Sequence, residues 1–195
     1  MKQSAWLALA LSVLCSSVFL SCDKTETNKH ASSDLPVVKS APQFSGENFD
    51  GRTFTSTSLK GSVWIASFMF TTCGGVCPVM NGHQSALQNE YSPKGVRFVS
   101  VSVDPDNDTR EALTAYAATY GIAPGSDVWY MLRMPIDSVR SLSVKGFLLS
   151  DPVEPSAHSP RFVLIDKEQN IRGYYDSMDS SKVRQLRLDI QKLIQ

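Results

Sequence analysis

The chain has 195 residues, and its 19 basic residues balance 19 acidic ones, so its formal net charge at neutral pH is zero. The sequence also contains no run of Lys or Arg. Nucleic-acid binding requires a basic surface, so this class of function has no support.

The first 21 residues are typical of an export signal. Lys2 precedes a mostly apolar stretch over residues 5–20, which is shorter than the ~20 apolar residues that a membrane-spanning helix needs. The stretch ends in Ser21-Cys22, which resembles the lipobox of bacterial lipoproteins. We therefore predict a signal peptide with a lipobox over residues 1–21, and a lipid on Cys22 that anchors the protein on the periplasmic side of a bacterial membrane. An ordinary signal peptide and an uncleaved anchor are the alternatives.

A polar segment follows the predicted signal. Residues 22–41 are rich in Thr, Asn, Lys and Ser and show no apolar periodicity before Leu35. Such a segment buries too little apolar surface to order itself, so we predict a flexible tether. As a random coil it would reach roughly 25 Å, enough to meet a membrane-bound partner. The remaining residues 42–195 have the length of one domain and can build a core without disulfides.

Apolar runs and turn residues predict the strands of this domain. Asp-Gly at residues 50–51, between two short apolar pieces, is a hairpin signal. A near-continuous apolar run over residues 63–70 is the pattern of a strand buried on both faces. The β-branched residues over 96–103 predict another strand. Further strands are predicted over residues 128–132, 161–166 and 171–175.

Helices are predicted between these strands. Pro78 is suited to the first turn of a helix that runs to Tyr91. Asp108 and Glu111 form a capping box for a helix over residues 109–120, and we interpret Asp108 mainly as the helix cap. The other predicted helices cover residues 136–144 and 180–194. Strands that alternate with helices, followed by a hairpin and a last helix, predict an α/β sandwich.

Cys73 and Cys77 lie between the first long strand and its helix, and the other two cysteines fall in the predicted export signal. A thiolate attacks disulfides and binds soft metals. Because Cys77 precedes Pro78, it should lie near the N-terminus of the helix, where the helix dipole lowers a thiol pKa. The Gly-Gly between the cysteines lets the loop close a disulfide or hold the two sulfurs around one ion.

The histidines are the candidates for a third metal ligand. Two thiolates plus one imidazole suit Cu(I) and can also hold Cu(II) or Zn(II). A four-cysteine zinc site is excluded for the mature chain, because two of the four cysteines fall in the predicted export signal. His30 lies in the predicted tether, and His83 should point away from Cys77 on the predicted helix. His158 lies in a loop before the strand over 161–166. On spacing alone, an ordinary loop histidine is the simpler interpretation.

Three motifs in register closely resemble the Sco/SenC family. They are Cys73-x-x-x-Cys77-Pro78 after a strand, the Asp104-Pro-x-x-Asp108-Thr run, and His158-Ser159 before a strand. Over residues 42–193 the resemblance implies a thioredoxin-like sandwich, with a central mixed sheet flanked by helices and an N-terminal hairpin.

The resemblance also implies a copper site. Cys73, Cys77 and His158 match the family's ligands for one copper per chain, as Cu(I) with Cu(II) as a second state, and the two cysteines match a redox-active pair able to form a disulfide. Asp104 and Asp108 match the aspartates of the family's run. The implied partner is the copper-site subunit of cytochrome c oxidase or another copper protein.

The chain departs from the family pattern between the cysteines. The family usually has Pro followed by an acidic residue where this chain has Gly74-Gly75. The change removes a negative charge and loosens the loop, so we expect copper affinity, redox poise or partner choice to differ. We also hypothesise that the Ser159–Pro160 bond is cis, as in thioredoxins.

Three functions are consistent with these residues. The first is a chaperone that delivers copper to the binuclear copper site of cytochrome c oxidase during assembly. The second is a thiol–disulfide oxidoreductase, in which one cysteine attacks and the other resolves the mixed disulfide; the expected low pKa favours Cys77 as the attacking thiol, and exposure favours Cys73. The third is a redox sensor, for which the sequence provides no separate output domain.

Overall fold

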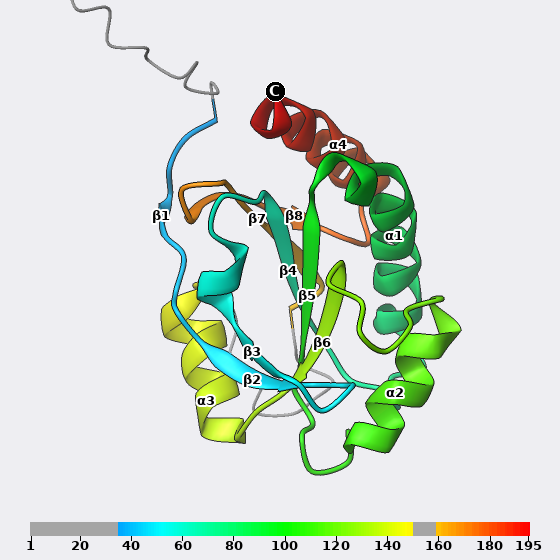
Figure 1. The fold of residues 1–195 in the computed structure, drawn as a ribbon. Coiled ribbons are helices and arrows are strands. Elements are labelled where there is room, and N and C mark those ends of the chain that lie inside the picture. The colour runs from blue at the N-terminus through cyan, green and yellow to red at the C-terminus, as the bar shows by residue number, and fades with distance from the viewer. Residues whose placement is uncertain (1–34, 150–158) are drawn as a thin grey trace, which may run out of the picture. The chain divides into compact units, whose positions relative to one another are not determined.

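The computed structural model describes residues 35–149 and 159–195. In these residues the strands form one sheet, in the order β1-β8-β7-β4-β5-β6-β2-β3 (Figure 1). The strands are β1 (Lys39–Ser40), β2 (Ser45–Asn48), β3 (Thr53–Thr55), β4 (Trp64–Met69), β5 (Arg97–Ser102), β6 (Trp129–Arg133), β7 (Arg161–Ile165) and β8 (Asn170–Asp176). The helices are α1 (Val76–Tyr91), α2 (Arg110–Thr119), α3 (Ile136–Ser141) and α4 (Ser180–Ile194).

The sheet is mixed, as the sequence predicts. β4, β5 and β6 run parallel, because α1 and α2 carry the chain back between them, while β7 pairs antiparallel with β4 and β2 pairs antiparallel with β6. Antiparallel pairing places the start of β7 at the edge of the sheet where β4 ends. The carboxyl ends of β4 and β5 lie at this same edge, the usual place for a site in an α/β sheet.

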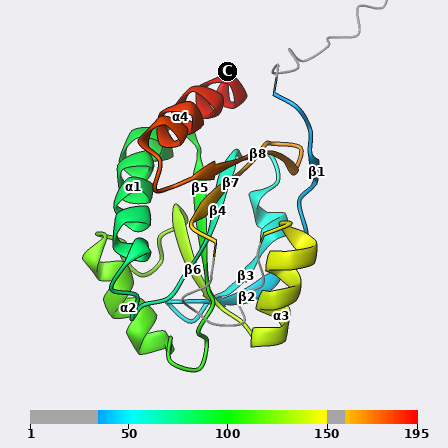
Figure 2. The same cartoon turned by 180° about the vertical axis from the view of Figure 1, so that it is seen from behind.

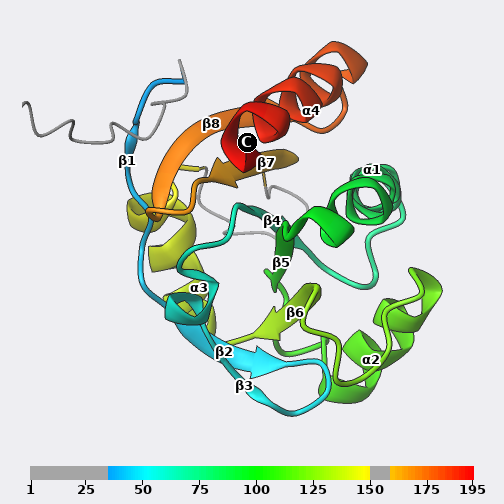
Figure 3. The same ribbon diagram turned by 45° about the horizontal axis from the view of Figure 1, so that its top comes forward.

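Helices cover both faces of the sheet. α1, α2 and α4 lie on one face and α3 on the other (Figures 1 and 2). The same arrangement is seen when the molecule is tilted so that its top comes forward (Figure 3). Alternate residues of each central strand therefore enter different cores. The core beneath α1 and α4 includes Ile65, Met69, Phe98, Leu87 and Leu186. The core beneath α3 includes Trp64, Phe68, Val99, Val101 and Val139.

The predicted hairpin is confirmed. β2 and β3 pair antiparallel, and the turn between them closes through a hydrogen bond from Asn48 N to Arg52 O of 2.8 Å. Gly51 has a φ of +82°, a left-handed conformation that favours glycine. Asp50 lies inside this turn and accepts hydrogen bonds from Asn48 Nδ2, Arg52 N and Nε, and Gly125 N. The Asp-Gly pair thus forms the turn that its sequence predicts.

The end of the predicted tether belongs to the sheet. β1 pairs with β8, Val38 N donates to Ile171 O at 2.9 Å, and Ala41 N donates to Gln169 O at 2.8 Å. The buried Arg172 donates to the carbonyl oxygens of Leu35 and Pro36. A polar segment can order in this way because an edge strand satisfies its backbone.

Residues 22–34, with the predicted lipid site Cys22, lie outside the described residues. Among the helices in the described parts, none is long and apolar enough to cross a membrane.

Candidate dithiol site

The two cysteines lie at the junction of β4 and α1, as the sequence predicts. β4 ends at Met69, and a turn follows in which Cys73 N donates to Phe70 O at 3.4 Å. α1 begins at Val76, two residues before the predicted start, with Gly75 as its N-cap. Pro78 is therefore the third residue of the helix, where its missing N–H leaves no intrahelical bond unmade.

The early helix start places the two cysteines in different surroundings. Cys77 lies in the first turn of α1 and is fully buried in the core beneath that helix, whereas Cys73 is half-buried. Both are thiols rather than a disulfide, and their side chains are hydrogen bonded to each other. The pair therefore combines one accessible sulfur with one enclosed sulfur that touches it.

The expectation of a low pKa at Cys77 is wrong. Burial raises the pKa of the Cys77 thiol to about 12, and the hydrogen bond to Cys73 and the negative charge of Asp108 act in the same direction, against a backbone hydrogen bond from Phe70. The helix dipole is worth only ~0.3–1 kcal/mol at an exposed site, which is less than the cost of burying a thiolate.

Cys73 has the lower pKa of the two. Burial alone would raise it, but the backbone amides of Cys77 and Gly75, together with the Cys77 thiol, donate hydrogen bonds that stabilise the thiolate and bring the pKa below its ordinary value. The start of α1 thus stabilises a negative charge on the sulfur outside the helix rather than on the one inside it. Cys73 is the nucleophile that this geometry favours.

The glycines between the cysteines leave the site open. Gly74 and Gly75 are exposed, and a Cβ added at either position would meet no atom within 4 Å. Packing therefore does not require glycine here. The consequence of the two glycines is a bare surface beside Cys73, across which another molecule can approach its sulfur.

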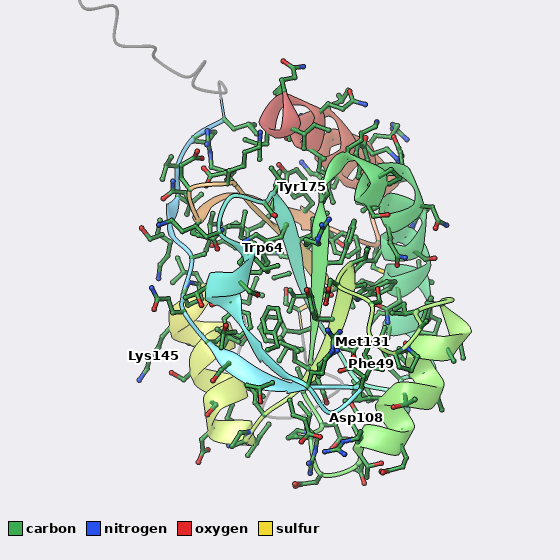
Figure 4. All side chains as sticks on the ribbon, in the orientation of Figure 1. Phe49, Trp64, Asp108, Met131, Lys145 and Tyr175 are labelled. Carbon is green, nitrogen blue, oxygen red and sulfur yellow. The ribbon has the colours of Figure 1, made fainter. Side chains whose placement is uncertain are left out.

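Asp108 is not the helix cap that the sequence predicts. The N-cap of α2 is Thr109, whose side chain accepts from Ala112 N at 3.2 Å. Asp108 is instead fully buried, and its carboxylate accepts from Thr71 N at 3.0 Å, Thr71 Oγ1 at 2.5 Å and Ser102 Oγ at 2.5 Å. It lies where β5 leads into α2 (Figure 4). Thr71 and Ser102 were not predicted as site residues.

Asp104 forms part of the turn between β5 and α2. Its carboxylate accepts from Asn107 Nδ2 at 2.9 and 3.0 Å, and its backbone oxygen accepts from Asn107 N and Asp108 N. Asp104 thereby shapes the turn that presents Asp108.

Of the three predicted ligands, the structure describes the two cysteines. His158 lies outside the described residues, and in the described ranges no group of three or more His, Cys, Asp and Glu side chains could hold a metal. His83 is half-buried on α1. The described residues contain no cis peptide bond, so the hypothesis of a cis Ser159–Pro160 bond is wrong.

A three-layer sandwich with two cysteine thiols at its β4–α1 junction defines a protein of the thioredoxin-like class. The sequence model of the SCO1/SenC family matches residues 34–124, which include this junction and the Asp104–Thr109 run. The relatives described next are SCO1 or Sco-family proteins, so the chain is similar to the SCO1/SenC family along most of its length.

Curated and solved relatives cover most of the chain. The SCO1 protein homolog of Bacillus subtilis strain 168 is 28% identical over 163 residues, which are 80% of this chain and 83% of that protein. A SCO1/SenC family lipoprotein from Bacillus anthracis strain Ames has a TM-score of 0.74 at 29% identity, over 84% of this chain and all of the other.

Two further solved structures carry functional descriptions of their own. BsSco, described as a member of the Sco family of cytochrome c oxidase assembly proteins with a disulfide switch, has a TM-score of 0.71 at 27% identity over 82% of this chain and 96% of its own. Yeast Sco1 with copper bound has a TM-score of 0.61 at 22% identity, over 78% and 89% of the two chains. At that identity the yeast protein shows only a shared fold.

Proposed function

We propose that this chain is a membrane-tethered copper-binding protein that delivers copper to the binuclear copper site of cytochrome c oxidase during assembly. The observation that carries the proposal is the pair of adjacent thiols, Cys73 and Cys77, at the β4–α1 junction of a Sco-family fold. The assembly role described for BsSco supports the same function.

The chemistry of the donors fits copper. Two cysteine sulfurs are the soft ligands that Cu(I) prefers, and an imidazole completes a site that can also hold Cu(II). We propose His158 as this third ligand. The support is topological, because β7, which begins three residues after His158, starts at the edge of the sheet where β4 ends. One copper per chain follows from one such ligand set.

Delivery requires an exchange of ligands. Copper bound by Cys73, Cys77 and His158 would pass to thiolates of the copper-site subunit of the oxidase, or of another copper protein, as the partner's sulfurs replace those of this chain one at a time. The half-buried Cys73, beside the bare surface at Gly74 and Gly75, is the sulfur that a partner can reach first. Copper keeps its oxidation state in this step.

We place the domain on the periplasmic side of a bacterial membrane, tethered by a lipid on Cys22. The export-signal pattern of residues 1–21 and the lipoprotein description of the Bacillus anthracis relative support this location. A test is the membrane partitioning of the expressed chain and of its Cys22→Ser variant after export. We expect the variant to lose its lipid and to appear in the soluble periplasmic fraction.

The copper proposal is tested by anaerobic Cu(I) titration against a competing chelator. The reduced chain carries Cys15→Ser and Cys22→Ser, so that Cys73 and Cys77 are its only thiols. We expect one tight copper per chain, no tight copper after Cys73→Ser/Cys77→Ser, and weaker binding after His158→Ala. His83→Ala is the matched control and should bind as tightly as the parent. Equal copper retention in the double cysteine variant would contradict the proposal.

A second function has its own observation in its favour. The accessible Cys73 with a lowered pKa, in contact with the buried Cys77, is the arrangement of an attacking and a resolving thiol. As a thiol–disulfide oxidoreductase, Cys73 would attack a partner disulfide and form a mixed disulfide. Cys77 would then lose its proton and attack the Cys73 sulfur. The partner leaves as a dithiol, and two electrons have moved to it from the Cys73–Cys77 pair.

The two functions are separated by their dependence on His158. Reduction of a disulfide-bonded partner peptide needs both cysteines but no third metal ligand, so His158→Ala should reduce the peptide at the rate of the parent. Copper retention should fall in the same variant. A chain that reduces the peptide and binds no tight copper would make the oxidoreductase the leading function.

A further inference from the structure

Asp108 is a fully buried carboxylate next to the dithiol loop, the segment from Phe70 to Gly75. Its hydrogen bonds come from neutral groups of Thr71 and Ser102, and among the described residues no ion pair to it is found. Burial of a carboxylate costs free energy unless hydrogen bonds compensate it. Since Asp108 does not cap α2, its place in the core needs another explanation.

The Asp108 carboxylate holds Thr71 of the dithiol loop through two hydrogen bonds. Oδ1 accepts from both the backbone N–H and the hydroxyl of Thr71, which fixes the backbone and the side chain of that residue together. Oδ2 accepts from Ser102 Oγ, so β5 orients the carboxylate itself. Hydrogen bonds to a charged acceptor are the stronger kind in proteins. The loop is therefore tied to a strand of the sheet.

The tie reaches both cysteines through the backbone of one residue, Phe70. Phe70 directly precedes Thr71, and its carbonyl oxygen accepts from Cys73 N at 3.4 Å. The backbone of Phe70 is also hydrogen bonded to the Cys77 thiol. When Asp108 fixes Thr71, it thus fixes the neighbour whose backbone contacts both members of the pair.

We propose that Asp108 is a positioning residue for the dithiol: through Thr71 it holds the loop so that Cys73 stays against Cys77, and it thereby sets how readily the pair closes a disulfide. The inference rests on the dithiol being the functional centre in either proposed function. Its test uses no copper, so a failed test would leave the copper proposal standing.

The expected effect follows from the geometry of ring closure. When glutathione disulfide oxidises the pair, an S–S bond forms between Cys73 and Cys77, two protons leave the thiols, and glutathione disulfide becomes two glutathione molecules. The equilibrium constant depends on the effective concentration of one thiol at the other. A loosened loop lowers that concentration, so loss of the Asp108 tie should lower the constant about tenfold, which is about 30 mV for two electrons.

The experiment equilibrates the full chain, with Cys15→Ser and Cys22→Ser, in glutathione redox buffers and counts alkylated thiols by mass spectrometry. Asp108→Ala should lower the equilibrium constant about tenfold. Asp108→Asn keeps an oxygen for Thr71 and an amide that can donate to Ser102 Oγ, so its constant should stay within about twofold of the parent. Thr72→Val changes the exposed neighbour of Thr71 and should have no effect.

Two results would overturn the proposal. A folded Asp108→Ala variant with the equilibrium constant of the parent would show that the tie does not act on the dithiol. Equal shifts in Asp108→Ala and Asp108→Asn would show that the charge acts rather than the hydrogen bonds.

If Asp108→Ala does not fold, two variants of Thr71 test the proposal instead. Thr71→Val removes one of the two bonds and should lower the constant about threefold, and Thr71→Ser should restore it. Equal constants in the parent, Thr71→Val and Thr71→Ser would overturn the proposal.

Discussion

The dithiol loop and the β2–β3 turn are both short connections organised by the carboxylate of one aspartate. Asp50 accepts hydrogen bonds from two residues within two positions of itself and from the backbone of Gly125. Its charge is balanced by Arg52, whose Nε lies 2.7 Å away. Asp108 serves Thr71, which is 37 positions away in the sequence, and its partners are neutral. The first arrangement stabilises a turn, and the second connects a reactive loop to the sheet.

The comparison distinguishes stability from reactivity. The β2–β3 turn is complete within its own residues and those around Gly125, and none of the side chains bonded to Asp50 belongs to the dithiol loop. The dithiol loop is fixed only when β5 has formed beside β4. Changes at Asp50 should therefore alter unfolding, and changes in the dithiol loop should alter thiol chemistry.

The largest expected effect is the difference between the two thiols. A thiol with a pKa of about 12 is only about one part in ten thousand thiolate at pH 8. We expect iodoacetamide to modify Cys73 at least about a hundredfold faster than the buried Cys77. The rate at Cys73 should rise with pH and reach half its maximum below the pKa of an ordinary thiol. Peptide mapping over a pH series measures both rates, and denatured protein, in which both react, is the control.

The second-largest expected effect is that of Asp50→Ala on the stability of the fold. The substitution leaves the donors of Asn48, Arg52 and Gly125 without their acceptor, and we expect the free energy of unfolding to fall by about 1–3 kcal/mol. Urea unfolding measures this change. The glutathione equilibrium constant of the dithiol should stay at the value of the parent. A shift in this constant would contradict the claim that Asp50 affects stability without affecting thiol chemistry. Asp127→Ala, at an exposed partner of Arg52, should cost less.

The smallest expected effect is the acid dependence of the same turn. Burial by itself would raise the pKa of Asp50, but hydrogen bonds from Gly125 and Arg52 outweigh it and lower the pKa from 3.8 to about 2. The folded pKa is below the unfolded one, so the stabilisation is present above about pH 4 and is lost as the pH falls towards 2. Unfolding curves between pH 5 and 2 should show a steeper loss for the parent than for Asp50→Asn.

Local patterns made much of the fold predictable. The apolar run over residues 63–70 became β4 because a strand buried on both faces needs no alternation. The Asp-Gly pair formed its turn because the signal and its partners are neighbours in the chain. The order of strands and helices followed from the same periodicities. These features depend on contacts over a few residues, which a sequence displays directly.

The properties of the site depended on distant contacts. The low pKa that the sequence predicts for Cys77 is wrong because the burial of this thiol arises from the packing of α1 on the sheet and outweighs the helix dipole. The sequence predicts Asp108 as the cap because it is the neighbour of Thr109, which caps α2, and both residue types are common at that position. The tie from Asp108 to Thr71 exists only once β4 and β5 pair. In the sequence, the one signal of this network is that Ser100 and Ser102 alternate with β-branched residues, which indicates polar side chains on one face of β5.

The most direct test of copper binding at the dithiol is X-ray absorption spectroscopy of the Cu(I)-loaded chain that carries Cys15→Ser and Cys22→Ser. We expect two sulfur ligands and one nitrogen ligand per copper, with the nitrogen lost in His158→Ala and both sulfurs lost in Cys73→Ser/Cys77→Ser. A copper environment without two sulfurs, or one unchanged by the cysteine substitutions, would contradict a dithiol copper site.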